Sequence, residues 1–130
     1  MYITLFQRAL KWLLSLVLLL PLTSHAEENS INAEQAAMLS KDKQAVIIDV
    51  REQNEWQQSH IPNAIHIPLN ELPQRLSELN RFKSSTIITQ CRSGKRSAQA
   101  QSVLKNAGFT TVLNLTGGLN AWQSAGLPTE

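Results

Sequence analysis

Residues 86–97 read Thr-Ile-Ile-Thr-Gln-Cys-Arg-Ser-Gly-Lys-Arg-Ser, and this stretch decides the fold. An apolar, β-branched segment leads into Cys91, the only cysteine of the chain. Such a segment is typical of a strand that is buried on both faces. A short loop with three cations and one glycine follows, and then a helical pattern that runs to about Asn106. The stretch therefore predicts a strand, a tight loop and a helix N-terminus, with the cysteine where they meet.

The position of Cys91 predicts a thiol that ionises readily. A helix N-terminus and neighbouring cations both lower the pKa of a cysteine, and Arg92, Lys95 and Arg96 are all close in sequence. The same charges would attract a small dianion, and Gly94 permits the positive φ of a tightly curled loop. The competing interpretation is a small core cysteine beside an ordinary solvated turn. The order of strand, loop and helix favours the reactive thiol.

The first 26 residues have the features of an export signal rather than of a folded domain. Arg8 and Lys11 form a basic region, residues 12–20 are apolar apart from one serine, and residues 24–26 end in small residues at the positions that a signal peptidase reads. We expect cleavage after Ala26, with residues 1–26 as the signal peptide and residues 27–130 as one domain. The alternative is an uncleaved membrane anchor, which the two charges disfavour because they interrupt the span.

Removal of this leader makes the charge of the remaining chain neutral. The full chain has 12 basic and 10 acidic residues, and the only charges in the leader are Arg8 and Lys11. The overall charge therefore does not indicate binding to nucleic acid. The positive charge of interest is the local cluster after Cys91. One cysteine with His60 and His66 makes no metal coordination set. We expect no metal, no nucleic-acid partner and no membrane partner after signal cleavage.

Strand patterns alternate with helix patterns along residues 31–125. Strands are predicted near Ile31 and at residues 45–50, 64–67, 86–89 and 111–115. Helices are predicted from the N-cap Asn32 to about Ser40, around Trp56, from the N-cap Asn70 through residues 72–79, from the cysteine loop to about Asn106, and at residues 119–125. This alternation predicts an α/β fold, with a mostly parallel five-stranded sheet and helices on both faces.

Three side chains follow predicted strands and are expected to meet at one edge of the sheet. Asp49, Cys91 and Thr116 each stand at or just beyond the carboxyl end of a strand. Ligands of open α/β sheets bind at that edge. The sequence therefore predicts the functional site there.

Three separated motifs resemble those of the single-domain rhodanese family. They span residues 31–128 in order and with family-like spacing: Ile48-Asp49-Val50-Arg51 with Glu55-Trp56 and His60-Ile61-Pro62-Asn63-Ala64, then residues 91–98, then Leu115-Thr116-Gly117-Gly118-Leu119 with Ala121-Trp122 and Gly126-Leu127-Pro128. With its export signal, the chain is most similar in type to small periplasmic thiosulfate sulfurtransferases.

The resemblance implies a sulfur transfer without a cofactor. Cys91 would take the outer sulfur of thiosulfate as a persulfide, release sulfite, and pass the sulfur to cyanide or a thiol acceptor. Asp49 and Arg51 would be structural residues at the edge of the site. The donor anion would be bound by the loop residues Arg92, Ser93, Gly94, Lys95, Arg96 and Ser97.

The chain departs from the family pattern at two positions, where Ser59 and Asn63 replace the usual glycines. Asn63 tolerates a left-handed turn, so the departure concerns local geometry. His60 and His66 are interpreted as structural. Asn114 begins a glycosylation sequon, but so short a pattern is common by chance and we assign it no role.

Two other functions remain alternatives to sulfur transfer. Cysteine-dependent phosphatases and arsenate reductases also place a reactive cysteine in an anion-binding loop. Their pattern has an arginine six positions after the cysteine, where this chain has Ser97. A non-catalytic rhodanese-fold module that binds a partner or carries sulfur is the second alternative. The intact cysteine and its cations disfavour a purely structural role.

Overall fold

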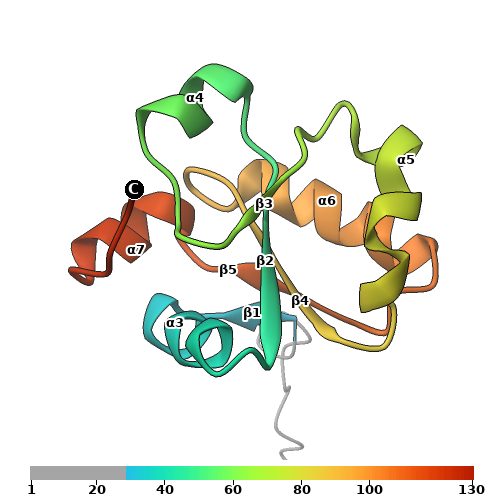
Figure 1. The fold of residues 1–130 in the computed structure, drawn as a ribbon, viewed down its shortest axis with the longest axis horizontal. Helices are drawn as coiled ribbons and strands as arrows, with labels where there is room; N and C mark the ends of the chain where they lie inside the picture. The colour runs from blue at the N-terminus through green and yellow to red at the C-terminus, as the bar shows by residue number, and fades with distance from the viewer. Residues whose placement is uncertain (1–28) are drawn as a thin grey trace, which may run out of the picture.

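The computed structural model describes residues 29–130 and contains one five-stranded sheet (Figure 1). Its strands are β1 (Ser30–Ile31), β2 (Ala45–Asp49), β3 (Ile65–His66), β4 (Thr86–Gln90) and β5 (Thr111–Leu115). They lie in the order β1-β5-β4-β2-β3, and every neighbouring pair is parallel. The predicted α/β fold is confirmed. The predicted leader, residues 1–26, lies outside the described residues.

Helices cover both faces of the sheet. They are α3 (Ala33–Lys41), α4 (Gln53–Gln58), α5 (Leu72–Arg75), the 3-10 helix η1 (Leu76–Phe82), α6 (Lys95–Asn106) and α7 (Gly118–Ser124). Helices α3 and α7 pack on one face, and α5, η1 and α6 pack on the other (Figure 1). Within residues 29–130, no helix has the length and hydropathy needed to cross a membrane.

Strand β4 is the centre of the sheet and contributes to both hydrophobic cores. Ile87 faces the core that contains Leu104 of α6, whereas Ile88 faces the core that contains Trp122 of α7. Both isoleucines are fully buried. Two-sided burial explains why this strand is a continuous apolar run without polar alternation.

Two local signals of the sequence are confirmed by the backbone. The side chain of Asn32 accepts a hydrogen bond from the N–H of Gln35 at 2.9 Å, as an N-cap residue does. Asn63 has φ +66, the left-handed conformation expected at a position where the family usually has glycine.

The predicted helix cap at Asn70 is wrong. Helix α5 begins at Leu72 after an N-cap at Glu71, and it continues as a 3-10 helix from Leu76. The N–H of Leu69 bonds to the carbonyl of Val50, just beyond β2, and the carbonyl of Pro68 accepts from the N–H groups of Glu71 and Leu72. These bonds form a turn over residues 68–72, and the helix therefore starts one residue later than a cap at Asn70 would place it.

Helix α7 presses directly against the cysteine loop. The N–H of Leu119 donates to the carbonyl of Cys91 at 2.8 Å, and the N–H of Asn120 donates to the carbonyl of Arg92 at 3.1 Å. Gly118 makes this approach possible, since a Cβ there would lie 2.4 Å from the Cys91 oxygen. The Gly117-Gly118 pair therefore does more than form a turn. It lets the start of α7 bind the backbone carbonyls of the cysteine loop.

Gly118→Ala is expected to destabilise the domain more than Gly126→Ala does. Both glycines have positive φ, +54 and +71, but a Cβ at Gly126 meets nothing within 4 Å. The control therefore measures backbone strain alone, about 1–3 kcal/mol, and the clash at Gly118 adds about 1–3 kcal/mol. Urea unfolding of both variants measures the difference. Equal losses of unfolding free energy would contradict the close approach of α7 to the loop.

Candidate active site

Cys91 follows β4 directly and has a free thiol that is only 1% exposed. It lies at the carboxyl edge of the sheet, where its side chain packs with Val50 and Ala100 in the core cluster covered by α6. Burial alone raises the pKa of a thiol, because the charged form loses its hydration. A functional Cys91 therefore depends on donors within the protein.

The loop supplies these donors to the sulfur. The N–H of Gly94 points at Sγ from 3.1 Å, and the hydroxyl of Ser97 lies 3.4 Å from it. Burial raises the pKa of the Cys91 thiol, but the Ser97 hydroxyl and the N–H groups of Ser97, Gly94 and Ser93 outweigh it, so the pKa is lowered. Gly94 has φ +108, which lets the loop curl around the sulfur.

The three cations of the loop are placed differently from one another. Arg96 is partly buried and forms a bidentate ion pair with Glu55, at 2.7 and 2.9 Å. Arg92 is half exposed, and its Nε lies 3.5 Å from the same carboxylate. Lys95 is exposed. One carboxylate therefore offsets part of the positive charge that the sequence places beside Cys91.

Glu55 is the site residue that sequence reasoning missed. It occurs in the first family motif, but 41 positions separate it from Arg96, so no local spacing joins them. Its carboxylate also accepts from the N–H of Glu52, which closes a capping box at the start of α4. The Arg96 guanidinium lowers the pKa of the Glu55 carboxyl to about 2, although burial opposes this shift.

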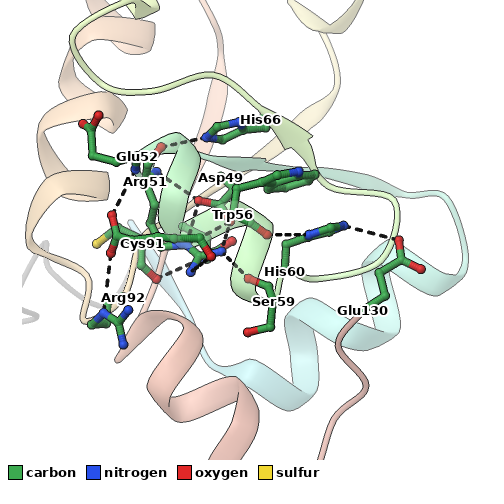
Figure 2. A network of polar contacts seen from close by, with 12 residues as sticks. Asp49, Arg51, Glu52, Trp56, Ser59, His60, His66, Cys91, Arg92 and Glu130 are labelled. Carbon is green, nitrogen blue, oxygen red and sulfur yellow. Dashed lines mark hydrogen bonds and ion pairs between the residues drawn. The ribbon is translucent and has the colours of Figure 1, made fainter.

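Asp49 and Arg51 form a buried pair beneath α4 and do not contact the sulfur. Their side chains are 0% and 1% exposed, and Arg51 Nη2 lies 2.7 Å from Asp49 Oδ2 (Figure 2). The backbone N–H of Arg51 also donates to Asp49 Oδ1. The guanidinium then donates to the carbonyls of Glu55 and Ser59. The pair thus holds α4, and α4 holds the carboxylate that reaches the cysteine loop.

Trp56 lies between the rings of the two described histidines (Figure 2). The centroid of its ring is 3.7 Å from that of His60 and 4.8 Å from that of His66. His60 Nδ1 bonds to the carbonyl of Trp56, and His66 Nε2 bonds to the carbonyl of Arg51. Both histidines therefore support the α4 segment through their ring stacking and hydrogen bonds.

The predicted site residues thus separate into two groups. Gly94 and Ser97 surround the sulfur, and Arg96, bound to Glu55, precedes Ser97 at the start of α6. Arg92, Ser93 and Lys95 lie at the exposed side of the loop. This arrangement can hold a sulfur atom that carries negative charge and can present cations to an anion that approaches from solvent.

A family model described as a rhodanese-like domain matches residues 32–125. The thiosulfate sulfurtransferase PspE of Escherichia coli is 40% identical over 70 residues, which cover 54% of this chain and 67% of PspE. A Bacillus subtilis protein provisionally named a sulfur carrier, YrkF, is 36% identical over 104 residues; the match covers 75% of this chain and 55% of that protein.

The fold has close counterparts among solved structures. A rhodanese-related protein from Thermoplasma volcanium superimposes with a TM-score of 0.71 at 30% sequence identity. The match covers 78% of this chain and 97% of the other. The two chains therefore share the architecture over nearly the whole of that protein.

Asp49→Ala is expected to lower the unfolding free energy by about 3–5 kcal/mol, because it leaves the buried Arg51 guanidinium without its partner. Denaturant unfolding measures the loss. The double variant D49A/R51M removes both charges and should recover part of the stability. An Asp49→Ala variant that is as stable as wild type would contradict the structural role of the pair.

Glu55→Gln is expected to destabilise the domain in a pH-dependent manner. The folded pKa of Glu55, about 2, lies below the ordinary value of 4.5. Its stabilisation is therefore present above about pH 4.5 and is lost as the pH falls through about 2. At pH 7 the variant should lose on the order of 2 kcal/mol after allowance for solvent screening.

The difference in unfolding free energy between wild type and Glu55→Gln should shrink between pH 4.5 and 2. Denaturant unfolding at a series of pH values follows this difference. Glu34→Gln is the matched control, because Glu34 is exposed at the start of α3. A difference that stays constant down to pH 2 would contradict the ion pair with Arg96.

Proposed function

The chain belongs to the rhodanese-like domain family as a sulfurtransferase or sulfur carrier, and we propose that it transfers the outer sulfur of thiosulfate through a persulfide on Cys91. The observation that carries this proposal is the buried sulfur with the Gly94 N–H 3.1 Å away. Hydrogen bonds fixed in a dry site stabilise a charged sulfur better than water-exposed groups do. No metal or organic cofactor enters the proposed reaction.

In the first half of this reaction, the Cys91 thiolate attacks the outer sulfur of thiosulfate. The new S–S bond forms as the S–S bond of thiosulfate breaks, and its electron pair leaves with sulfite. In the second half, cyanide or a thiolate attacks the outer sulfur of the persulfide and regenerates the Cys91 thiolate. The charge remains on sulfur throughout, so no general base is required.

The loop residues have distinct proposed roles in binding the donor. The N–H groups of Ser93, Gly94 and Ser97 stabilise the anionic sulfur. Arg92 and Lys95 orient the sulfonate part of thiosulfate from the exposed side. Arg96 acts beside the sulfur while it is held by Glu55. Asp49 and Arg51 are proposed as structural residues that keep α4 in place.

A sulfur carrier that is loaded by a partner protein is the second candidate. It is favoured by the similarity to the Bacillus subtilis protein, of which the chain covers 55%. The same Cys91 persulfide would serve it, but the donor would be a persulfidated protein rather than thiosulfate. The two candidates therefore differ in the donor and not in the chemistry at Cys91.

A phosphatase or arsenate reductase activity is disfavoured by the residue at position 97. The hydroxyl of Ser97 faces the sulfur where those enzymes would need an arginine. Arg96, one position earlier, is occupied by its bidentate pair with Glu55. The loop is therefore better suited to a sulfur atom than to a tetrahedral oxyanion.

The proposed place of this reaction is the periplasm. The basic and apolar pattern of residues 1–26 supports export and cleavage after Ala26. Cellular fractionation and the N-terminal sequence of the mature protein test this location. Recovery of the full-length chain in the membrane fraction would favour the anchor instead.

The intact mass of the protein after incubation with thiosulfate is expected to increase by one sulfur atom. Cyanide should remove this atom and release thiocyanate. Cys91→Ser should show no added mass and a loss of transfer of at least a hundredfold, because the hydroxyl is a far weaker nucleophile at neutral pH. The thermal midpoint of the variant should stay near that of wild type.

Each other outcome of this experiment points to a different function. No added mass with thiosulfate, but addition from a persulfidated protein, would replace the proposed enzyme by a sulfur carrier. Unchanged transfer by Cys91→Ser would end the persulfide mechanism. Hydrolysis of a phosphate ester at a rate comparable to sulfur transfer would favour the phosphatase alternative.

A further inference from the structure

The side-chain amide of Asn114 joins the two loop residues that face the sulfur. Its Nδ2 donates to the carbonyl of Gly94 at 2.9 Å. Its Oδ1 lies 2.6 Å from the hydroxyl oxygen of Ser97. The amide orientation is determined by this pair of contacts, since a backbone carbonyl can only accept a hydrogen bond. Asn114 therefore turns its acceptor, not its donor, toward Ser97.

The Ser97 hydroxyl has one proton and two acceptors within reach. Asn114 Oδ1 is 2.6 Å from Oγ, and Cys91 Sγ is 3.4 Å from it. Both are hydrogen-bond distances for the atoms concerned, because sulfur is larger than oxygen. A hydroxyl can donate to only one of them fully at a time. Cys91 and Asn114 consequently compete for the same proton.

The charge of the sulfur decides this competition. A Cys91 thiol can donate to Ser97 while Ser97 donates to Asn114, and all three groups are then satisfied. A thiolate needs the Ser97 proton for itself, which leaves the oxygens of Ser97 and Asn114 facing each other without a hydrogen between them. Two acceptors in such contact repel. The thiolate is thus the state that the Asn114 oxygen disfavours.

We propose that Asn114 is a positioning residue that competes with Cys91 for the hydroxyl proton of Ser97. Ser97 donates to Asn114 when Sγ is a thiol, and it turns to Sγ when the sulfur is a thiolate. This inference deepens the proposed function, and its second part, which concerns the persulfide, rests on that function. In a persulfide the negative charge moves to the outer sulfur, so Ser97 can return to Asn114. The persulfide is then favoured relative to the thiolate.

The other groups around the sulfur stay in place when Asn114 is replaced. The carbonyl of Gly94 keeps a second hydrogen bond, which it accepts from the N–H of Ala98 at 3.2 Å. Arg92 and Arg96 come from the loop and α6, and Glu55 comes from α4, so none of these charged groups depends on the amide. A change in Cys91 reactivity is therefore attributable to the Ser97 proton.

The test measures the rate of Cys91 alkylation by iodoacetamide against pH in Asn114→Leu, Ser97→Ala and the double variant. Leucine has the shape of asparagine without its polar atoms. Asn114→Leu should react about three- to tenfold faster than wild type below the pKa of Cys91, the effect of one hydrogen bond released to the thiolate. Above that pKa the acceleration should disappear.

The double variant shows whether Asn114 acts through Ser97. Ser97→Ala should slow alkylation below the pKa of Cys91, and the slowing should be larger by about the same factor in the Asn114→Leu background. Equal effects of Ser97→Ala in both backgrounds, or slower alkylation by Asn114→Leu, would overturn the proposal. Asn114→Ala repeats the test if the leucine variant does not fold, and Asn106→Leu, at an exposed position, should match wild type.

A second measurement separates this inference from the choice of sulfur donor. After incubation with thiosulfate and removal of the excess, the persulfidated fraction should be lower in Asn114→Leu than in wild type. A fraction that is equal in both would overturn the second part of the inference. If wild type forms no persulfide at all, the proposed use of thiosulfate fails, while the alkylation profiles still decide the role of Asn114.

Discussion

A buried sulfur that carries charge needs hydrogen-bond donors that cannot move away, and the rest of this domain supplies them. Cys91 is 1% exposed, so water cannot perform that function. The curled loop turns the Gly94 N–H to the sulfur from 3.1 Å. Helix α7 holds the same loop from beneath through the carbonyls of Cys91 and Arg92. The strands, the glycine pair and the helix N-terminus are all arranged around this one requirement.

The electrostatics of the site differ from a simple cluster of cations. Glu55 binds Arg96 in a bidentate pair and lies near Arg92, so the positive charge beside the sulfur is partly offset. Hydrogen bonds from the loop, rather than the full charge of three cations, lower the pKa of Cys91 against its burial. In the proposed reaction, excess positive charge in this site would retain sulfite as well as thiosulfate. A moderated charge is compatible with both the binding of the donor and the release of the product.

The buried Asp49–Arg51 pair links this electrostatic arrangement to the sheet. Asp49 ends β2, and Arg51 carries its charge to the carbonyls of Glu55 and Ser59 on the α4 segment. The family motif therefore contains a buried ion pair that holds the α4 segment. The stack of Trp56 between His60 and His66 adds packing to the same segment. Residues that are distant from the sulfur thus determine where the Glu55 carboxylate lies.

Local patterns in the sequence were sufficient for the strands, most helices and the position of Cys91, because periodicity, caps and β-branched runs act within a few residues. They failed at Asn70, where the turn that follows the Leu69–Val50 hydrogen bond moves the helix start by one residue. They could not join Glu55 to Arg96, or Asn114 to Ser97, since these partners are 41 and 17 positions apart. The sequence by itself therefore determined the fold and the place of Cys91 at the end of β4. Only the tertiary structure decided which side chains moderate the cations and share the Ser97 proton, because packing of separate elements creates those contacts.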